Sequence, residues 1–257
     1  MARTRPADRI SSLINAAIRV FLLKGFRRAQ MADIAREMGV SPGSLYNYVE
    51  SKEALFYLVI DQGFDNPPLG ESRPLPVRNP PPGVIVKRIA ERFRREAAVP
   101  ALLAALKCLR AEDPGAELEA VVRELYGNIY RTAYITTMLG RSALDMPELA
   151  EVFFGKMRGG AISMLTSLIG SRTEAGQYRR VPHPAVAARL ILETITWFAR
   201  NRRGDPNSQD IDDESAEETT IDFIVNSLVA SPRPRLPIAS PAAVRASNGK
   251  PKGEPRS

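Results

Sequence analysis

The sequence predicts an all-α fold in which a small N-terminal domain of helices is joined to a larger C-terminal helical bundle. Apolar residues recur at spacings of three and four along most of the chain, the period of an amphipathic helix. No segment alternates apolar and polar residues as a half-buried strand would. Residues 65–83 are rich in proline and cannot form a helix or a central strand, so they separate two helical regions.

Capping residues and turn residues set the helices of the first region. Asp8 is the expected N-cap of the first helix and Gly25 its expected end, while Ser41 and Ser51 precede two later helices. Pro42 suits the first position of the third helix, because its missing N–H would have no partner there. The expected helices are 8–24, 31–38, one from 42 that breaks at 49–51, and 52–63, within a domain at 8–64.

Helical patterns resume after the proline-rich linker and continue to residue 230. An acidic segment, 205–218, reads as a linker before the last helix, and a metal site there is a weaker alternative. The tail at 231–257 is rich in Pro, Ala, Ser and Arg and is expected to be disordered. The expected helices of this domain, 84–230, are 84–97, 100–111, 117–139, 147–154, 156–174, 184–203 and 217–230.

Composition excludes several classes of protein. The chain has 257 residues, of which 44% are hydrophobic and 25% charged, values typical of a globular protein. It has no run of 18 uncharged apolar residues, and arginines interrupt the first 20 residues, so neither a membrane span nor a secretory signal is expected. Cys108 and His183 are the only cysteine and histidine, so no internal disulfide can form, and neither a Cys/His zinc cluster nor a Cys–His catalytic pair is expected unless the two meet. No bound metal and no cofactor is expected. Enzyme motifs such as a P-loop, a nucleophile elbow or HExxH are missing, and the protein is not expected to be an enzyme.

The net charge of +7 is concentrated at the two ends of the chain. Residues 1–48 hold eight basic and three acidic residues, and residues 231–257 hold six basic residues and one acidic residue. The middle is therefore mildly acidic. A basic head on a near-neutral body indicates a nucleic-acid-binding module joined to a domain with another task, and solubilising charge is the alternative.

Residues 29–55 carry the most informative pattern, two short helices joined by a turn that contains Gly39. Ala35 is small, as required where two helices cross closely, and Gly39 allows a backbone conformation that a Cβ would penalise. Ile34, Met38, Val40 and Leu45 have the spacing of a small core beneath the turn. The helix after the turn would then project its first residues into a major groove.

The pattern resembles the DNA-binding domain of the TetR family of bacterial transcriptional regulators over about residues 8–64. Two positions differ from the family's usual pattern. The sequence has Ala29-Gln30 where a Ser or Thr cap is usual, and Ala32 where a polar or basic residue is common. The residues that carry the resemblance are Asp33, Ile34, Ala35, Gly39, Val40, Ser41, Gly43, Leu45, Tyr46, Tyr48, Val49, Ser51, Lys52, Glu53 and Leu55.

The resemblance implies a role for each matching residue of the DNA-binding domain. Tyr46 and Lys52 would contact backbone phosphates, and Arg27 and Arg28 would compensate for the missing polar residue by doing the same. Asn47 could bond adenine and Ser44 could read several bases, so neither defines an operator. The groove-facing residues would be Ser41, Pro42, Gly43 and Ser44, flanked by Asn47 and Tyr48.

The resemblance also implies a homodimer that binds a palindromic double-stranded DNA operator. Helices 184–203 and 217–230 would pair with their copies in a four-helix interface, and a monomeric core is the alternative. The central helices would enclose a cavity for an unknown small-molecule effector, and Tyr126, Tyr130, Tyr134 and Met138, four residues apart, would share one face. Plain core packing is the alternative for each candidate, which are Tyr126, Tyr130, Tyr134, Met138, Phe153, Met157, Met164 and Trp197.

A sequence-specific transcriptional regulator follows from this resemblance, a repressor released by a small-molecule effector. Activation is equally permitted by the sequence. The alternative is a regulator whose C-terminal domain binds a protein partner and no small ligand. The resemblance places such a regulator in the cytoplasm, associated with the nucleoid and not with a membrane.

Overall fold

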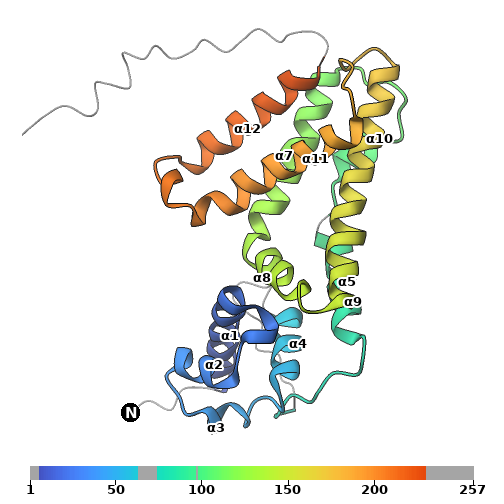
Figure 1. Ribbon diagram of the computed structural model, residues 1–257. Coiled ribbons are helices and arrows are strands. Elements are labelled where there is room, and N and C mark those ends of the chain that lie inside the picture. The colour runs from blue at the N-terminus through green and yellow to red at the C-terminus, as the bar shows by residue number, and fades with distance from the viewer. Residues whose placement is uncertain (1–5, 63–73, 97, 230–257) are drawn as a thin grey trace, which may run out of the picture.

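The computed structural model describes residues 6–62, 74–96 and 98–229. Within these residues the chain forms helices, with two isolated β-bridges and no strand, which confirms the all-α prediction. The N-terminal helices form the lower part of Figure 1, called the head here (6–62), and the remaining helices form the body (84–229). The predicted disordered tail and residues 65–73 of the predicted linker lie outside the described residues.

The head contains α1 (Pro6–Arg28), α2 (Met31–Met38), α3 (Pro42–Leu45) and α4 (Lys52–Gln62). Because α1 begins at Pro6, Asp8 lies inside the helix, and the prediction that it is the N-cap was wrong. Gly25 interrupts α1 as predicted, with φ of 70° and ψ of 172°, a combination almost confined to glycine. The chain nevertheless returns to helix up to Arg28.

The body contains eight α-helices and several shorter turns among the described residues. Its first helix has the predicted bounds to within a residue, whereas the second, expected over 100–111, already ends at Ala105. The elements are α5 (Val84–Glu96), α6 (Pro100–Ala105), α7 (Pro114–Arg131), α8 (Ala133–Ala143), α9 (Pro147–Ala150), the π-helix η1 (Glu151–Gly159), α10 (Gly160–Glu174), α11 (Pro184–Thr196), the π-helix η2 (Trp197–Asn201), the 3-10 turns η3 (Arg202–Gly204) and η4 (Pro206–Ser208), and α12 (Asp213–Leu228).

The long helix predicted over 117–139 is two helices, α7 and α8, which meet at Thr132. The backbone there has φ of −98° and ψ of 11°. The hydroxyls of Thr132, Thr136 and Thr137 donate to the carbonyls four residues earlier, a pattern that bends helices. Tyr126 and Tyr130 lie on α7, whereas Tyr134 lies on α8. The prediction that these tyrosines share one helical face was therefore wrong.

Two other predicted boundaries were also wrong. The helices expected at 147–154 and 156–174 are one continuous run, because the π-turns of η1 carry the chain from α9 into α10. The last helix begins at Asp213 and not at 217. Asp212 is its N-cap, and its carboxylate accepts the N–H of Ser215 at 2.8 Å. The end of the predicted acidic linker thus forms the first turns of α12, where carboxylates favour the helix dipole.

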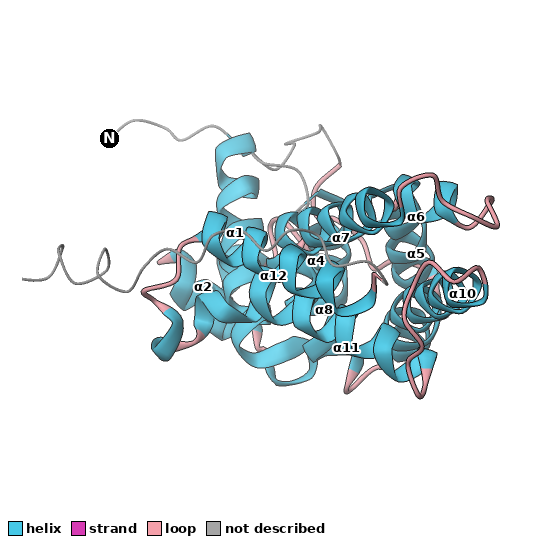
Figure 2. Cartoon of the chain, turned by 90° about the horizontal axis from the view of Figure 1, so that it is seen from above, coloured by secondary structure: helices cyan, strands magenta, loops and turns pink. Residues whose placement is uncertain are grey.

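The buried apolar residues form two clusters. The first fills the head and extends into the body through α5, α8, α9 and η1, so that α1 packs closely against α8. The second lies among α6, α7, α10, α11 and α12. Seen from above, α2 of the head and α10 of the body lie at opposite ends of the molecule (Figure 2). Because the first cluster is continuous, α5, α8, α9 and η1 of the body share a core with the head.

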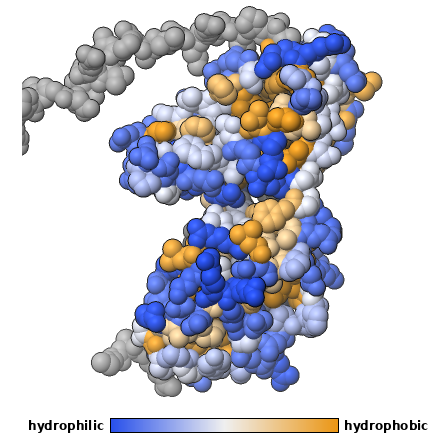
Figure 3. Space-filling model, viewed as in Figure 1, coloured by the Kyte–Doolittle hydropathy of each residue, from blue (hydrophilic) through white to orange (hydrophobic). Residues whose placement is uncertain are grey.

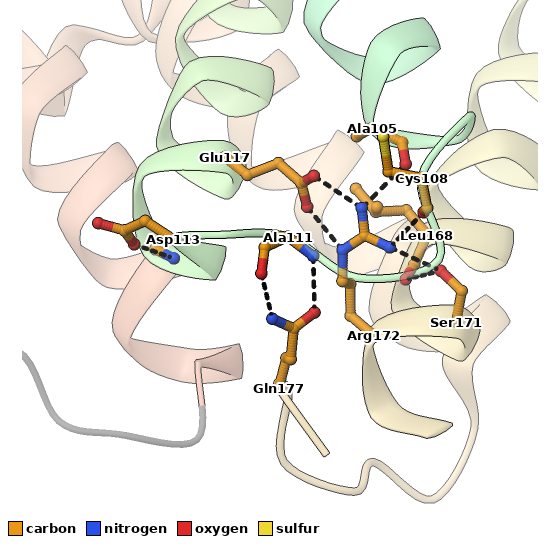
Figure 4. Close-up of polar contacts among 10 residues, drawn as sticks. Ala105, Cys108, Ala111, Asp113, Glu117, Leu168, Ser171, Arg172 and Gln177 are labelled. Carbon is orange, nitrogen blue, oxygen red and sulfur yellow. Dashed lines mark hydrogen bonds and ion pairs between the residues drawn. The ribbon is translucent and has the colours of Figure 1, made fainter. Parts of the chain in front are cut away.

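A fully buried arginine joins two segments of the body that are distant in sequence (Figure 4). The guanidinium of Arg172 on α10 donates to both carboxylate oxygens of Glu117 on α7, at 2.8 and 2.7 Å. It also donates to the carbonyls of Cys108 and Ala105, each at 2.9 Å. The Glu117 carboxylate raises the pKa of Arg172 further above its ordinary value. This network fixes the connection after α6 against α7 and α10.

Candidate nucleic-acid interface and effector cavity

A small apolar core holds α2 and α3 in place. Ile34, Ala35 and Leu45 have no exposed surface, while Met38 and Val40 are partly buried beside them. Gly39 has φ of 72°, and its N–H bonds the carbonyl of Arg36 at 3.1 Å. A Cβ at Gly39 would meet no atom within 4 Å, so glycine is needed there for its backbone conformation and not for space. The predicted helix-turn-helix core is confirmed.

The outward face of α3 and the turn after it carry the residues predicted to contact DNA. Ser41, Pro42, Gly43, Tyr46 and Asn47 are exposed. Ser44 and Tyr48 are half-buried. The hydroxyl of Ser41 does not cap α3 but lies 2.8 Å from the hydroxyl of Ser44. Pro42 has no N–H and the N–H of Ser44 bonds the carbonyl of Ser41 at 3.0 Å, which leaves the N–H of Gly43 for a phosphate oxygen.

Asp33 fixes the start of α2 although the usual Ser or Thr cap is missing. Its carboxylate accepts the N–H of Gln30 at 3.1 Å and lies 2.8 Å from the ammonium of Lys24 on α1. Arg36 approaches the same carboxylate at 3.4 Å. The hydrogen bond from Lys24 is the main cause that lowers the pKa of Asp33, and partial burial opposes it. The sequence pattern missed this cap.

Lys52 stabilises the end of α1. Its ammonium donates to the carbonyls of Ala29 at 3.0 Å and Arg27 at 3.2 Å, and it lies 4.6 Å from the ring centroid of Phe26. One of its three N–H groups remains for a phosphate. The side chains of Arg27 and Arg28 are exposed at the same end of α1. Three cations are thus gathered where the resemblance places the DNA backbone.

The described end of the proline-rich linker is hydrogen-bonded to the turn after α3, which the sequence did not indicate. The N–H of Val77 donates to the carbonyl of Tyr48 at 2.8 Å, and the N–H of Glu50 donates to the carbonyl of Val77 at 2.9 Å. Asn79 adds a bond from its N–H to the Glu50 carboxylate at 3.0 Å. Residues 77–79 therefore connect the base of α3 to α5, which begins a few residues later.

A cavity of about 440 Å³ lies in the body between the two apolar clusters. Phe93, Val152 and Phe153 belong to the first cluster and line one part of it. Leu102 and Leu125 belong to the second cluster and line another part. A molecule bound here would contact both cores at once.

The cavity includes some of the residues predicted to bind an effector and leaves out the others. Phe153, Met157 and Met164 line it. Tyr126 is buried in the second cluster, and Met138 is buried in the first cluster, where it packs toward the head. Tyr130, Tyr134 and Trp197 also lie outside the cavity lining.

Tyr130 has a different contact. Its hydroxyl donates to the carboxylate of Asp213 at 2.8 Å, and its ring lies 3.9 Å below the guanidinium carbon of Arg203. Asp213 also pairs with Arg203 at 2.9 Å and with Arg202. These contacts hold the start of α12 against α7.

Apolar side chains are exposed on α11 and α12, the helices predicted to form a dimer interface. Val186, Leu190 and Phe223 are 55%, 63% and 67% exposed, and they border a shallow hollow between the two helices. Both helices project on the same side as α1 and α2 (Figure 1), and the surface is notched between them and the head (Figure 3). None of the helices in the described ranges is long and apolar enough to cross a bilayer.

Comparison with known proteins gives matches in the head. A family model described as "Bacterial regulatory proteins, tetR family" matches residues 13–59. The uncharacterized HTH-type transcriptional regulator YfiR of Bacillus subtilis (strain 168) is 39% identical over 57 residues, which are 22% of this chain and 28% of that protein. The HTH-type transcriptional regulator UidR of Escherichia coli (strain K12) is 42% identical over 50 residues, 20% of this chain and 26% of that protein. The chain therefore matches little more than a quarter of the length of these relatives.

Solved structures resemble the whole chain more weakly. AibR, solved in complex with isovaleryl coenzyme A and operator DNA, has a TM-score of 0.49 at 16% identity, over 84% of this chain and 97% of that one. A TetR-like transcriptional regulator from Rhodococcus sp. RHA1 has a TM-score of 0.48 at 19% identity, over 87% and 97%.

Proposed function

We propose that this chain, which belongs to the TetR family of bacterial regulatory proteins through its N-terminal domain, is a sequence-specific DNA-binding transcriptional regulator. The observation that carries the proposal is the geometry of α2 and α3. A small buried core fixes the turn, and the side of α3 away from that core presents polar side chains and the N–H of Gly43. Such a helix fits the major groove of DNA.

In this proposal the contacts divide into those that position the protein and those that read sequence. Tyr46, the free N–H of Lys52, and the exposed Arg27 and Arg28 contact phosphates, and the start of α3 at Ser41, Pro42 and Gly43 lies closest to the groove. Ser44 and Asn47 meet base edges, with Tyr48 beside them.

We infer that the regulator binds DNA as a homodimer. Exposed side chains such as Leu190 and Phe223 on α11 and α12 form an apolar surface, and a second copy of the same surface would cover it by two-fold symmetry. Such a dimer suits an operator with two related half-sites.

The cavity supports regulation by a small molecule. It lies where the core shared with the head meets the second core, so a bound molecule that changes their spacing would move the head. Release of a repressor from its operator is the outcome we propose. The size of the cavity favours this reading over a body that binds only a protein partner.

The proposal is tested by recovering protein-bound genomic DNA fragments near physiological salt and sequencing them. One motif should be enriched. Replacing Tyr46 with Phe should weaken binding to all fragments alike, whereas Asn47→Ala should change the preferred base at one position and cost about 1–3 kcal/mol there. Recovery of fragments with no shared sequence would contradict the proposal.

A further inference from the structure

The described charged residues that line the cavity are all basic. Among the residues whose side chains the structure describes, four basic side chains border it and no acidic side chain does. Most of the remaining lining is apolar, including Phe93, Ile129 and Met164. The basic residues are Arg94, Lys156, Arg158 and Arg200.

Two of these cations already have carboxylate partners. Arg158 pairs with Glu193, which also lies 2.5 Å from Arg189. The ammonium of Lys156 lies 3.1 Å from Glu151, and both side chains of that pair are well exposed. Their charge is therefore largely offset by the protein itself or by water.

Arg200 is different, because it is half-buried and forms no ion pair with any carboxylate in the described part of the chain. Its Nε donates to the side-chain oxygen of Asn201 at 3.0 Å, and its Nη1 lies 3.5 Å from the hydroxyl of Thr136. Burial lowers the pKa of Arg200, and the positive charge of Arg158 lowers it further, while Glu193 opposes both. A guanidinium in such a place gains strongly from an anion that it can bind with two N–H groups.

We propose that the cavity binds an amphiphile with an apolar chain and an anionic head group, a carboxylate or a phosphate, and that Arg200 binds the head group. This inference rests on the proposed effector cavity. The apolar lining takes the chain, and Thr196 provides a hydroxyl on the cavity wall for a remaining head-group oxygen.

The single tryptophan of the chain, Trp197, lies three residues before Arg200 and offers a fluorescence signal for binding. The full chain without DNA is titrated with decanoate, decyl phosphate, decan-1-ol and decyltrimethylammonium, and with shorter and longer carboxylates. The two anions should bind, and the alcohol and the cation about ten- to a hundredfold more weakly. The ratio between decanoate and decyl phosphate identifies which head group the site prefers.

Substitutions separate the role of Arg200 from general charge. Arg200→Gln should weaken decanoate by about ten- to a hundredfold and leave decanol unchanged, and Arg200→Lys should restore part of the loss. The control is Lys107→Gln, which removes one positive charge from an exposed site outside the cavity and should have no effect. Equal binding of decanoate and decanol, no binding by any carboxylate, or a loss no larger in Arg200→Gln than in Lys107→Gln would overturn the inference.

Binding to DNA is measured separately, so that the two proposals fail independently. If decanoate binds through Arg200 but leaves the DNA complex intact, the ligand class is right and the proposed release is wrong. If the protein selects DNA but binds no anion, the regulator stands and the ligand class is wrong.

Discussion

Lys52 illustrates how one side chain can serve both the fold and the proposed interface. The resemblance implies a phosphate contact, whereas two of its N–H groups bond carbonyls at the end of α1. Replacing it would therefore disturb α1 and DNA binding together. Tyr46 is half exposed, and a Phe there removes only a hydroxyl. It is the better position for testing phosphate contacts.

Arg172 should be the most costly single residue to remove from the body. Its guanidinium is fully buried, so Arg172→Ala leaves the Glu117 carboxylate and two carbonyls without their donor. We expect a loss of about 3–5 kcal/mol in the free energy of unfolding. Urea unfolding followed by Trp197 fluorescence measures this loss. Arg110→Ala is the control, because Arg110 is exposed and donates a single hydrogen bond, to the Ala175 carbonyl. A similar loss in both variants would contradict this role.

Asp33 should make the stability of the head depend on acid. Its pKa is lowered in the folded state, so its contribution is present above its ordinary pKa of 3.8 and is lost as the pH falls through the lower folded value. Asp33→Asn should destabilise the protein by about 1 kcal/mol near neutral pH. The difference should be smaller at about pH 3, where Asp33 binds a proton in the unfolded chain and begins to do so in the folded protein. Thermal unfolding at both pH values measures it, and a difference that stays constant would refute the assignment.

The sequence predicts the DNA-contacting residues of α3 better than it predicts the residues that line the cavity. The exposed residues of α3 could be assigned from sequence, because a short helix and its turn define which side chains point outward. The cavity could be assigned only in part, at Phe153, Met157 and Met164, because its lining comes from six or more elements brought together by tertiary packing. The turn at Thr132 separated Tyr126 from Tyr134, and Arg200 had no local signal at all.

Among the elements, those with strong local signals were predicted well. The bounds of α2 follow from its apolar spacing and Gly39, and α5 follows the proline-rich linker as expected. Boundaries set by competing hydrogen bonds were missed, such as the threonine hydroxyls that end α7 and the π-turns of η1. The contact of Val77 with the turn after α3 joins positions far apart in sequence and left no pattern.

The linker contact should support DNA binding. Val77→Pro removes the N–H that bonds the carbonyl of Tyr48, which lies at the end of the proposed recognition segment. We expect DNA affinity to fall about fivefold, the value of one hydrogen bond of about 1 kcal/mol. Val77→Ala keeps the N–H and serves as the control in mobility-shift titrations. If alanine lowers affinity as much as proline does, the side chain and not the hydrogen bond is what matters.

At the scale of the whole molecule, the exposed apolar surface of α11 and α12 should control assembly. Leu190→Glu places a charge at its centre and should convert a dimer to a monomer, as measured by sedimentation velocity. Leu109→Glu is the matched control, because Leu109 is 87% exposed and lies away from this surface. DNA affinity should fall with the dimer. A wild-type protein that sediments as a monomer would contradict the proposed interface.

The two basic regions of the chain should contribute differently to DNA binding. The described basic residues of the head lie on α1, on α2 and at the start of α4, and Arg27, Arg28 and Lys52 lie together. The basic tail lies outside the described residues. Its positive charge should add salt-sensitive affinity for any DNA, so removing residues 232–257 should leave the preferred sequence unchanged.

The central claim is that this protein selects a DNA sequence through α3. The most direct measurement is a mobility-shift titration of the motif recovered from genomic DNA against a scrambled version of it, near physiological salt. The motif should bind about a thousandfold or more tightly than the scrambled sequence, and Asn47→Ala should reduce this ratio. Equal affinity for the two DNAs would contradict it.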